Sequence, residues 1–451
     1  MASSATSTTA PARRCAYRVC RRVFGQGAYA DRALHGESAG LDARDRGLAM
    51  RLAFGTIQRR LTLDHLIEQF ADRPAPRLDP HVLAALRLGL YELLFLDGAP
   101  DRAVVADSVQ LAKDARRGGH GLVNAVLRRA ATEGADALDA LTDDTPENAA
   151  VRHSHPRWLA RHWFDVLGPE AARALMAADN EPAELALRVN TLTADADAVL
   201  DELPAPARRD PVLPEALVVD GPFDTHGSSL WASGAVMAQS RAAMGVARAL
   251  APEPGERVLD LCAAPGAKTT HLAALMDGRG EIAAVERHGG RATALRATCA
   301  RMGAANVTVR VADAGRPVDG GPYDRVLLDP PCSGLGTLQA RPDLRWRVTP
   351  EGVATLARAQ GALLDAAAAA VRPSGGILVY STCTISPEEN ERAIEGFLDR
   401  HQDFVPDELP GRSFAAAAHV AEGRALTLPH RDGTAGFFVA RLRRHGGRGG
   451  A

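Results

Sequence analysis

The stretch Tyr323-Asp-Arg-Val-Leu-Leu-Asp-Pro-Pro-Cys-Ser-Gly-Leu-Gly336 contains a short apolar run that ends abruptly. Val326, Leu327 and Leu328 are typical of a strand that is buried on both faces. Prolines cannot continue the hydrogen-bond ladder of a sheet, so the strand should end at Asp329-Pro-Pro-Cys332. Ligands bind at the carboxyl ends of strands in open parallel sheets. The stretch therefore predicts a carboxylate and a thiol at a ligand-binding edge.

Apolar strands alternate with amphipathic helices from about residue 234 onward. The expected strands are Arg257–Leu261, Glu281–Val285, Val307–Val311, Arg325–Leu328, Gly376–Tyr380 and a final one at Gly436–Leu442. The expected helices between them are Lys268–Met276, Gly290–Met302 and Glu351–Val371. This alternation is typical of a parallel sheet covered on both faces. Residues 231–444 should therefore form an α/β domain with a doubly wound sheet.

The N-terminal region has a helical pattern instead. Leu83, Leu86 and Leu90 recur at helical spacing after Asp79-Pro80, an N-cap followed by proline. This pattern predicts an all-α bundle over residues 12–133. The Ser/Thr/Ala-rich residues 1–11 before it should be a disordered tail.

A third, smaller domain is expected between these two. Residues 134–150 have the composition of an acidic linker, and residues 151–230 should form an α+β unit. Its expected elements are a helix at Pro156–Asp179, a strand at Leu185–Asn190, a helix at Ala194–Leu203 and a proline-rich loop at Leu203–Pro214.

Composition describes a soluble, cytoplasmic protein. The 451 residues are 46% hydrophobic and 24% charged, and no apolar run approaches the roughly 20 residues of a membrane span. The first residues lack the charged start and apolar centre of a secretory signal. The formal net charge of −2 does not by itself predict a nucleic-acid partner. Only Lys113 and Lys268 are lysines among 53 basic residues, which singles out Lys268 for its position described below.

Arginines are dense along the helical region. They include Arg13, Arg14, Arg18, Arg21, Arg22, Arg51, Arg59, Arg60, Arg116, Arg117, Arg128 and Arg129. Such charges are commonly solvated faces of helices. Arginine also suits contacts to phosphate, so the same residues are consistent with an RNA-binding surface. The sequence leaves both interpretations open.

The stretch Val258-Leu-Asp-Leu-Cys-Ala-Ala-Pro-Gly-Ala-Lys268 is a strand, a loop of small residues and the start of a helix. Small residues let a ligand approach the backbone, and the amides at a helix N-terminus favour a negative group. The loop lacks the G-x-G-x-x-G of a dehydrogenase. Glu286 and Asp313 follow the next two strands, where acids bind ribose hydroxyls or an adenine edge. Together these positions predict an adenosine-type ligand.

Two of the six cysteines stand at the ends of neighbouring strands. Cys332 follows the strand at Arg325–Leu328, and Cys383 follows the apolar strand that ends near Tyr380. A thiolate is a useful nucleophile when a base is adjacent or its pKa is low. The other cysteines should be inert, three within helical patterns and one as a space-filler in the small-residue loop: Cys15, Cys20, Cys299 and Cys262. No CxxC pair is present, so we expect no metal site.

These motifs resemble those of the RsmB/Sun (Fmu) family of ribosomal RNA cytosine-C5 methyltransferases. The matching stretches are Arg188–Asn190, Asp260–Thr269, Asp329–Gly336, Arg341–Trp346 and Ser381–Asn390. The N-terminal region resembles a NusB-type RNA-binding bundle at Gly27–Asp31, Leu86–Tyr91 and Val123–Arg129.

The resemblance implies a cofactor, S-adenosylmethionine, and a role for each residue of the site. The cofactor would lie across Cys262, Ala263, Ala264, Pro265, Gly266, Ala267 and Lys268, with Glu286 on its ribose, Asp313 near its adenine and Asp329 between cofactor and base. Cys383 would attack C6 of cytosine, and Cys332 would assist loss of the C5 proton and release of the enzyme. Without such an adduct, C5 is a poor nucleophile.

The implied partner is ribosomal RNA of the small subunit, with no DNA and no membrane, and the expected state is a monomer. The sequence departs from the family pattern at Ala267, Ser240 and Ala435, none of which is among the two thiols or three acids. An amino-group methyltransferase, which also uses Asp-Pro-Pro, would leave Cys383 without a role. A non-catalytic RNA or transcription module would leave both thiols without one.

Overall fold

The computed structural model describes residues 9–115, 118–411, 413–414 and 418–446. The described chain divides into two compact units. One contains the residues up to Pro182 together with Leu338–Arg347, and the other contains Ala183–Thr337 and the residues from Val348 onward. Most of the expected tail at 1–11 lies outside the described residues, and the first helix begins at Pro11. In the described part of the chain, every helix is too short or too polar to span a bilayer.

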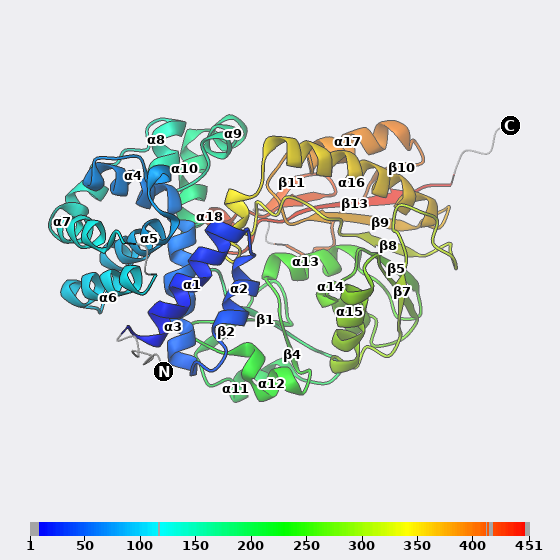
Figure 1. Cartoon of the computed structure of the whole chain (residues 1–451). Helices are drawn as coiled ribbons and strands as arrows, with labels where there is room; N and C mark the ends of the chain where they lie inside the picture. The colour runs from blue at the N-terminus through cyan, green and yellow to red at the C-terminus, as the bar shows by residue number, and fades with distance from the viewer. Residues whose placement is uncertain (1–8, 116–117, 412, 415–417, 447–451) are drawn as a thin grey trace. The chain divides into compact units, whose positions relative to one another are not determined.

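The first unit is built of helices, drawn in blue to cyan in Figure 1. They are α1 (Pro11–Gln26), α2 (Ala30–Glu37), α3 (Ala43–Gln58), α4 (Arg60–Ala71), η1 (Ala75–Arg77), α5 (Pro80–Phe95), α6 (Asp101–Asp114), α7 (His120–Asp139), α8 (Pro146–Arg152), α9 (Arg157–Leu167) and α10 (Pro169–Ala178). The apolar faces of α1 to α7 share one core, to which α1, α3, α4, α5 and α7 contribute fully buried side chains. The side chain of Asp79 accepts a hydrogen bond from the His81 amide, so α5 starts at the proline as expected.

The acidic linker expected at 134–150 is wrong at both ends, and only residues 140–145 of it lie outside helices. Helix α7 continues to Asp139, and α8 begins at Pro146. Gly134 lies against Leu94, where an added Cβ would approach the leucine Cδ2 to 2.7 Å. The acidic composition gave no sign of this packing. The contact depends on Leu94 of another helix, which a local sequence pattern does not report.

The segment Leu338–Arg347, which contains η3 (Leu344–Trp346), packs with these helices. The fully buried guanidinium of Arg345 donates to the carbonyls of Ser154 and Asp179, each at 3.0 Å, and to Asn180 Oδ1 at 3.0 Å. The indole N–H of Trp346 donates to the Ile57 carbonyl at 2.7 Å. These bonds occupy carbonyls at the ends of helices, which otherwise lack partners.

The second unit contains a small antiparallel sheet in the order β2-β3-β1-β4. Its elements are β1 (Ala186–Val189), α11 (Ala196–Glu202), β2 (Ala207–Arg209), β3 (Ala216–Val219), η2 (Thr225–Gly227), α12 (Ser229–Ala232) and β4 (Val236–Ala238). The expectation of loop throughout Leu203–Pro214 is wrong at β2, which pairs with β3. An edge strand needs only one partner, so its sequence signal is weak.

The larger sheet of this unit has the order β11-β12-β13-β9-β8-β5-β6-β7, with β10 paired to β13. Its strands are β5 (Arg257–Leu261), β6 (Glu281–Glu286), β7 (Val307–Val311), β8 (Arg325–Leu328), β9 (Ile377–Thr382), β10 (Phe404–Pro406), β11 (His419–Ala421), β12 (Arg424–Leu426) and β13 (Phe438–Arg444). Pairs among β5 to β9 are parallel, whereas β13 is antiparallel to β9. The sheet is therefore mixed at one side.

Helices cover both faces of this sheet (Figure 1). One face carries α13 (Arg241–Leu250), α14 (Ala267–Leu275) and α15 (Gly289–Arg301), and the other carries α16 (Pro350–Ala370) and α17 (Glu391–Arg400). A short α18 (Pro429–Asp432) precedes β13. The predicted doubly wound α/β class is confirmed.

The parallel register brings the ends of five strands to one edge. Leu261 pairs with Leu328 and Val285, and Leu328 pairs with Tyr380. Glu286 likewise pairs with Val311, so the loops after β5, β6, β7, β8 and β9 open at the same side of the sheet, as ligand-binding loops do in such folds.

Candidate active site

The loop after β5 makes a tight turn before α14. Cys262 has a φ of +65° and Gly266 a φ of +107°, and α14 begins directly at Ala267. Ala263 and Ala264 are buried, whereas Pro265 is exposed. Burial raises the pKa of the Cys262 thiol to about 12, so this thiol stays protonated near neutral pH. The expected cofactor loop thus has small side chains and an inert thiol.

Lys268, in the first turn of α14, is joined to Asp329 at the end of β8. The ammonium Nζ lies 2.7 Å from Asp329 Oδ2, and Ser381 Oγ donates to the other oxygen, Oδ1, at 3.0 Å. Burial by itself lowers the pKa of Lys268, but the charge and hydrogen bond of Asp329 outweigh it, and the net pKa is raised. The same ammonium lies 5.1 Å from the centroid of the Phe437 ring. Lysine is therefore charged and held in place here.

Glu286 and Asp313 follow β6 and β7. Glu286 is buried, accepts from the His288 amide at 2.9 Å, and has its second oxygen 3.4 Å from Arg291 Nε. Asp313 is exposed and accepts from the Gly315 amide at 3.0 Å. Both are oxygen acceptors at successive strand ends, and such acceptors match the hydroxyls of a ribose and the amino group of an adenine. The residues present therefore fit an adenosine-type ligand.

Cys332 and Cys383 lie together at the ends of β8 and β9. Their Sγ atoms are 3.2 Å apart, and both residues are unlinked thiols. The hydrogen bond to Cys383 raises the pKa of Cys332 well above its usual range, with burial and the negative charges of Cys383, Glu389 and Asp329 acting in the same direction. The Cys332 thiol therefore stays protonated and is able to donate the hydrogen bond between the two sulfurs.

Backbone contacts hold the loops of the two thiols against each other. The Gly336 amide donates to the Cys383 carbonyl at 3.0 Å, and the Gly436 amide donates to the Gly336 carbonyl at 2.7 Å. A Cβ on Gly336 would lie 2.0 Å from the Gly436 carbonyl oxygen, a separation that no side chain can occupy. Position 336 therefore requires glycine, because two backbone segments approach closely there, beside the thiols.

The sequence analysis missed Glu389. The pattern Ser386-Pro387-Glu388-Glu389 is typical of a helix start, but α17 begins only at Glu391. The Glu389 side chain is fully buried and accepts from the Ser333 amide at 2.9 Å. An acidic residue at the start of a helix usually interacts with the N-terminus of that helix. Only the contact with the distant Cys332 loop shows that Glu389 has another role.

Asp260, inside β5, is a second buried acid near the site. Thr269 Oγ1 donates to its Oδ2 at 2.6 Å, and its Oδ1 has no hydrogen-bond partner among the described residues. Burial is the main cause that raises the pKa of Asp260, to about 7. This carboxyl group is therefore substantially protonated at pH 6.

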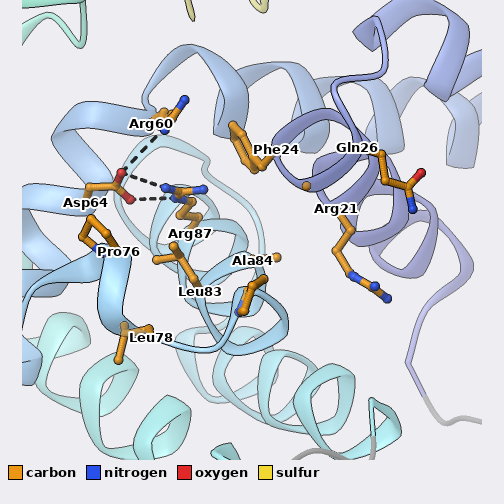
Figure 2. Close-up of a pocket in the computed structure, with 12 residues that line it drawn as sticks. Arg21, Phe24, Gln26, Arg60, Asp64, Pro76, Leu78, Leu83, Ala84 and Arg87 are labelled. Atoms are coloured by element: carbon orange, nitrogen blue, oxygen red, sulfur yellow. Dashed lines mark hydrogen bonds and ion pairs between the residues drawn. The ribbon is translucent and has the colours of Figure 1, made fainter.

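The helical unit contains its own cavity of about 440 Å³ (Figure 2). In Figure 2, Asp64 lies between two arginines: its carboxylate binds the buried Arg87 at 2.6 and 2.8 Å and is 3.9 Å from Arg60 Nε. The Arg87 guanidinium lies 4.5 Å from the Phe24 ring centroid. Arg21 also lines the cavity, so arginines from α1, α4 and α5 share one hollow of the bundle.

A doubly wound sheet with acids at the ends of successive strands and no dehydrogenase glycine pattern defines the class of S-adenosylmethionine-dependent methyltransferases. Within that class, residues 247–443 match the family model of the 16S rRNA methyltransferase RsmB/F, and residues 10–132 match that of the NusB family. Residues 155–226 match the ferredoxin-like domain of RsmF/B-like methyltransferases.

Curated relatives agree over nearly the whole chain. The probable ribosomal RNA small subunit methyltransferase B of Bacillus subtilis is 35% identical over 419 residues, covering 90% of this chain and 92% of its own. The ribosomal RNA small subunit methyltransferase B of Thermus thermophilus is 37% identical and covers 89% of both chains. The crystal structure of PH0851 superposes with a TM-score of 0.79 at 28% identity, over 97% of this chain and 100% of that one. The chain belongs to the RsmB/Sun family, and the resemblance found in its motifs is confirmed.

Proposed function

We propose that the protein transfers a methyl group from S-adenosylmethionine to C5 of a cytosine in small-subunit ribosomal RNA, through a covalent adduct with Cys383. The observation that carries this proposal is the 3.2 Å separation of two thiols at the ends of adjacent strands, beside Asp329. Relatives named as small-subunit ribosomal RNA methyltransferases support the choice of RNA.

The two thiols have separate tasks in this mechanism. The Cys383 thiolate forms a bond to C6, which makes C5 nucleophilic enough to take a methyl group. Asp329, held by Lys268 and Ser381, accepts a hydrogen bond from the C4 amino group of the base. The cofactor, when bound, supplies the methyl group. The proton then leaves C5, the C5=C6 bond re-forms, and the bond from C6 to Cys383 breaks.

Cys332 acts in this second half. Its pKa is raised mainly by the hydrogen bond to Cys383. Once the Cys383 sulfur is bonded to carbon, that acceptor no longer carries a negative charge, so the thiol of Cys332 ionises more readily and releases its proton to water. A thiolate of Cys332 next to the adduct can then accept the C5 proton.

We infer that the cofactor lies against the loop Cys262–Lys268, with Glu286 on its ribose hydroxyls and Asp313 near its adenine. The turn at Gly266 and the buried alanines leave the backbone accessible, which supports this assignment. An acid that accepts hydrogen bonds from both ribose hydroxyls is typical of doubly wound folds.

We also propose that the helical region 12–133 binds RNA, while regions 151–230 and 231–444 present the base and carry out the transfer. Arg21 and Arg60 line the same cavity as the aromatic ring of Phe24. Arginine contacts phosphates, and aromatic rings stack on unpaired bases. The cytosine must leave its stack to reach the thiols.

The test is methyl transfer to small-subunit ribosomal RNA by Cys383→Ala and Cys332→Ala. The first variant should lose activity and form no adduct, whereas the second should accumulate a denaturation-resistant RNA–protein adduct. Cys299→Ala, a buried cysteine of α15, is the matched control and should behave as the parent. Full activity of Cys383→Ala would instead favour transfer to an amino group.

A further inference from the structure

Two adjacent residues, Glu389 and Asn390, contact the loops of both thiols. We propose that they are separate positioning residues: Glu389 sets the position of Cys332, and Asn390 sets that of Cys383. This inference rests on the proposed function, because it assigns each residue to one half of the covalent mechanism.

The Glu389 carboxylate holds the residue that follows Cys332. Its Oε1 accepts from the Ser333 amide at 2.9 Å, and its Oε2 accepts from the Ser333 hydroxyl. The side chain is fully buried, and no cation pairs with it among the described residues. A buried carboxylate destabilises the fold unless it accepts hydrogen bonds. The two hydrogen bonds from Ser333 are therefore strong, and they hold the loop that carries Cys332 in place.

Gln360, a buried residue of α16, holds the residue on the other side of Cys332. Its Nε2 donates to the Pro331 carbonyl at 2.9 Å and to Glu389 Oε1 at 2.9 Å. Residues 331 and 333 are thus both connected to one carboxylate. Cys332 lies between them and has little freedom to move relative to Glu389.

Asn390 makes the corresponding pair of contacts around Cys383. Its Oδ1 accepts from the Thr382 hydroxyl at 2.6 Å, and its Nδ2 donates to the Thr384 carbonyl at 3.0 Å. Asn390 is buried, with 1% of its surface exposed. The side chain therefore holds the residue before Cys383 and the residue after it.

Glu389 and Asn390 belong to the same backbone segment, but their side chains make chemically different contacts. The hydroxyl of Tyr380 donates to the Glu389 carbonyl at 2.6 Å, which holds this backbone against β9 whatever the two side chains are. The hydroxyls of Ser333 and Thr384 are 2.6 Å apart, which links the two thiol loops directly. The Glu389 side chain nevertheless contacts only the Cys332 loop, and the Asn390 side chain only the Cys383 loop, so removing either one should displace its own thiol more than the other.

The experiment compares Glu389→Ala and Asn390→Ala in the full-length protein with ribosomal RNA. Glu389→Ala should release product slowly and accumulate the covalent adduct, as Cys332→Ala does. Asn390→Ala should show slow attack and little adduct. A displacement of about 1 Å can reduce rates roughly 100-fold, and we expect a loss of turnover of that order in each variant.

Three further measurements separate positioning from folding. Glu389→Gln keeps an acceptor oxygen for the Ser333 amide and should retain most of the turnover. The neighbouring Glu388→Ala, which removes a pair with Arg392 and a hydrogen bond from the Ser386 hydroxyl but none of the hydrogen bonds that hold the two thiol loops, should behave as the parent. Affinity for S-adenosylmethionine should stay near the parental value in all soluble variants, and adduct levels are compared at a temperature below the thermal midpoint of every variant. If Glu389→Ala does not fold, Gln360→Met is the alternative. It removes the hydrogen bonds to the Pro331 carbonyl and to Glu389, and it should accumulate the adduct.

The failures are distinguishable. If Cys332→Ala traps no adduct, the covalent mechanism itself is wrong. If Cys332→Ala traps the adduct but neither Glu389→Ala nor Gln360→Met does, only the positioning inference is overturned. Equal adduct levels in Glu389→Ala and Asn390→Ala would show that the two residues act as one structural unit, which also overturns it.

Discussion

Lys268 Nζ lies 2.7 Å from Asp329 Oδ2, so one ion pair joins the loop after β5 to the loop after β8. The first loop is assigned to the cofactor and the second carries Cys332. The pair therefore connects the two substrates of the proposed reaction. The geometry suits a lysine in a chain that has only one other, because a compact ammonium fits between a carboxylate and the Phe437 ring.

Removal of this ammonium should impair catalysis. Lys268→Met leaves Asp329 without its cation, and breaking a partly buried pair costs about 3 kcal/mol. We expect turnover to fall on the order of 100-fold, because a shift of the Asp329 carboxylate by about 1 Å is enough for a loss of that order, measured as methyl transfer at saturating cofactor. Lys113→Met, which changes the other lysine at an exposed position of α6, should leave turnover unchanged. Parental activity of Lys268→Met would contradict this role.

The reactivity of Cys332 should depend on Cys383. Since the hydrogen bond to Cys383 is the main cause of its raised pKa, Cys383→Ala should lower the pKa of Cys332. The alkylation rate of Cys332 by iodoacetamide should then begin to rise at lower pH than in the parent, measured by mass spectrometry of peptides. Cys299, whose pKa is raised to about 11 chiefly by burial, is the internal control and should not shift. An unchanged profile for Cys332 would show that the hydrogen bond to Cys383 is not the main cause of its raised pKa.

Stability should fall between pH 4 and pH 7 because of Asp260. Burial raises its pKa to about 7, so in this range the folded chain binds a proton that the unfolded chain releases. The contribution is present below pH 4 and is lost as the pH rises through 7, at most about 4 kcal/mol. Asp260→Asn should flatten this slope in urea unfolding measured at several pH values. Asp313→Asn, at an exposed site, should keep the parental slope.

Arg345 should be essential to the stability of the helical unit. Arg345→Met leaves buried carbonyls of Ser154 and Asp179 without their donor, at about 1–3 kcal/mol each. We expect a lower thermal midpoint for the unit, followed by circular dichroism. Arg341→Met, an exposed arginine of the same segment, should unfold like the parent. Equal thermal midpoints in both variants would mean that the Arg345 hydrogen bonds do not stabilise the helical unit.

The sequence predicted the strands β5 to β9 almost to the residue, because their compact apolar runs alternate with amphipathic helices. It also placed Cys332 and Cys383 at neighbouring strand ends, which the parallel pairing of β8 and β9 confirms. The roles of the thiols and of the cofactor-loop residues remain predictions, since they depend on substrates rather than on the fold.

What the sequence did not show are contacts between distant segments. Glu389 has the pattern of a helix start, and only the fold reveals that its partner is Ser333. Helix α7 continues through an acidic stretch because Gly134 packs on Leu94. Local patterns report local propensity, and tertiary contacts override them.

The position of Leu338–Arg347 has a consequence for how the chain folds during synthesis. The helical unit uses this segment, yet residues 183–337 are made in between. A nascent chain that has emerged only to Pro182 still lacks the guanidinium and indole donors of Arg345 and Trp346. The first unit to leave the ribosome is therefore completed only after most of the second has been translated.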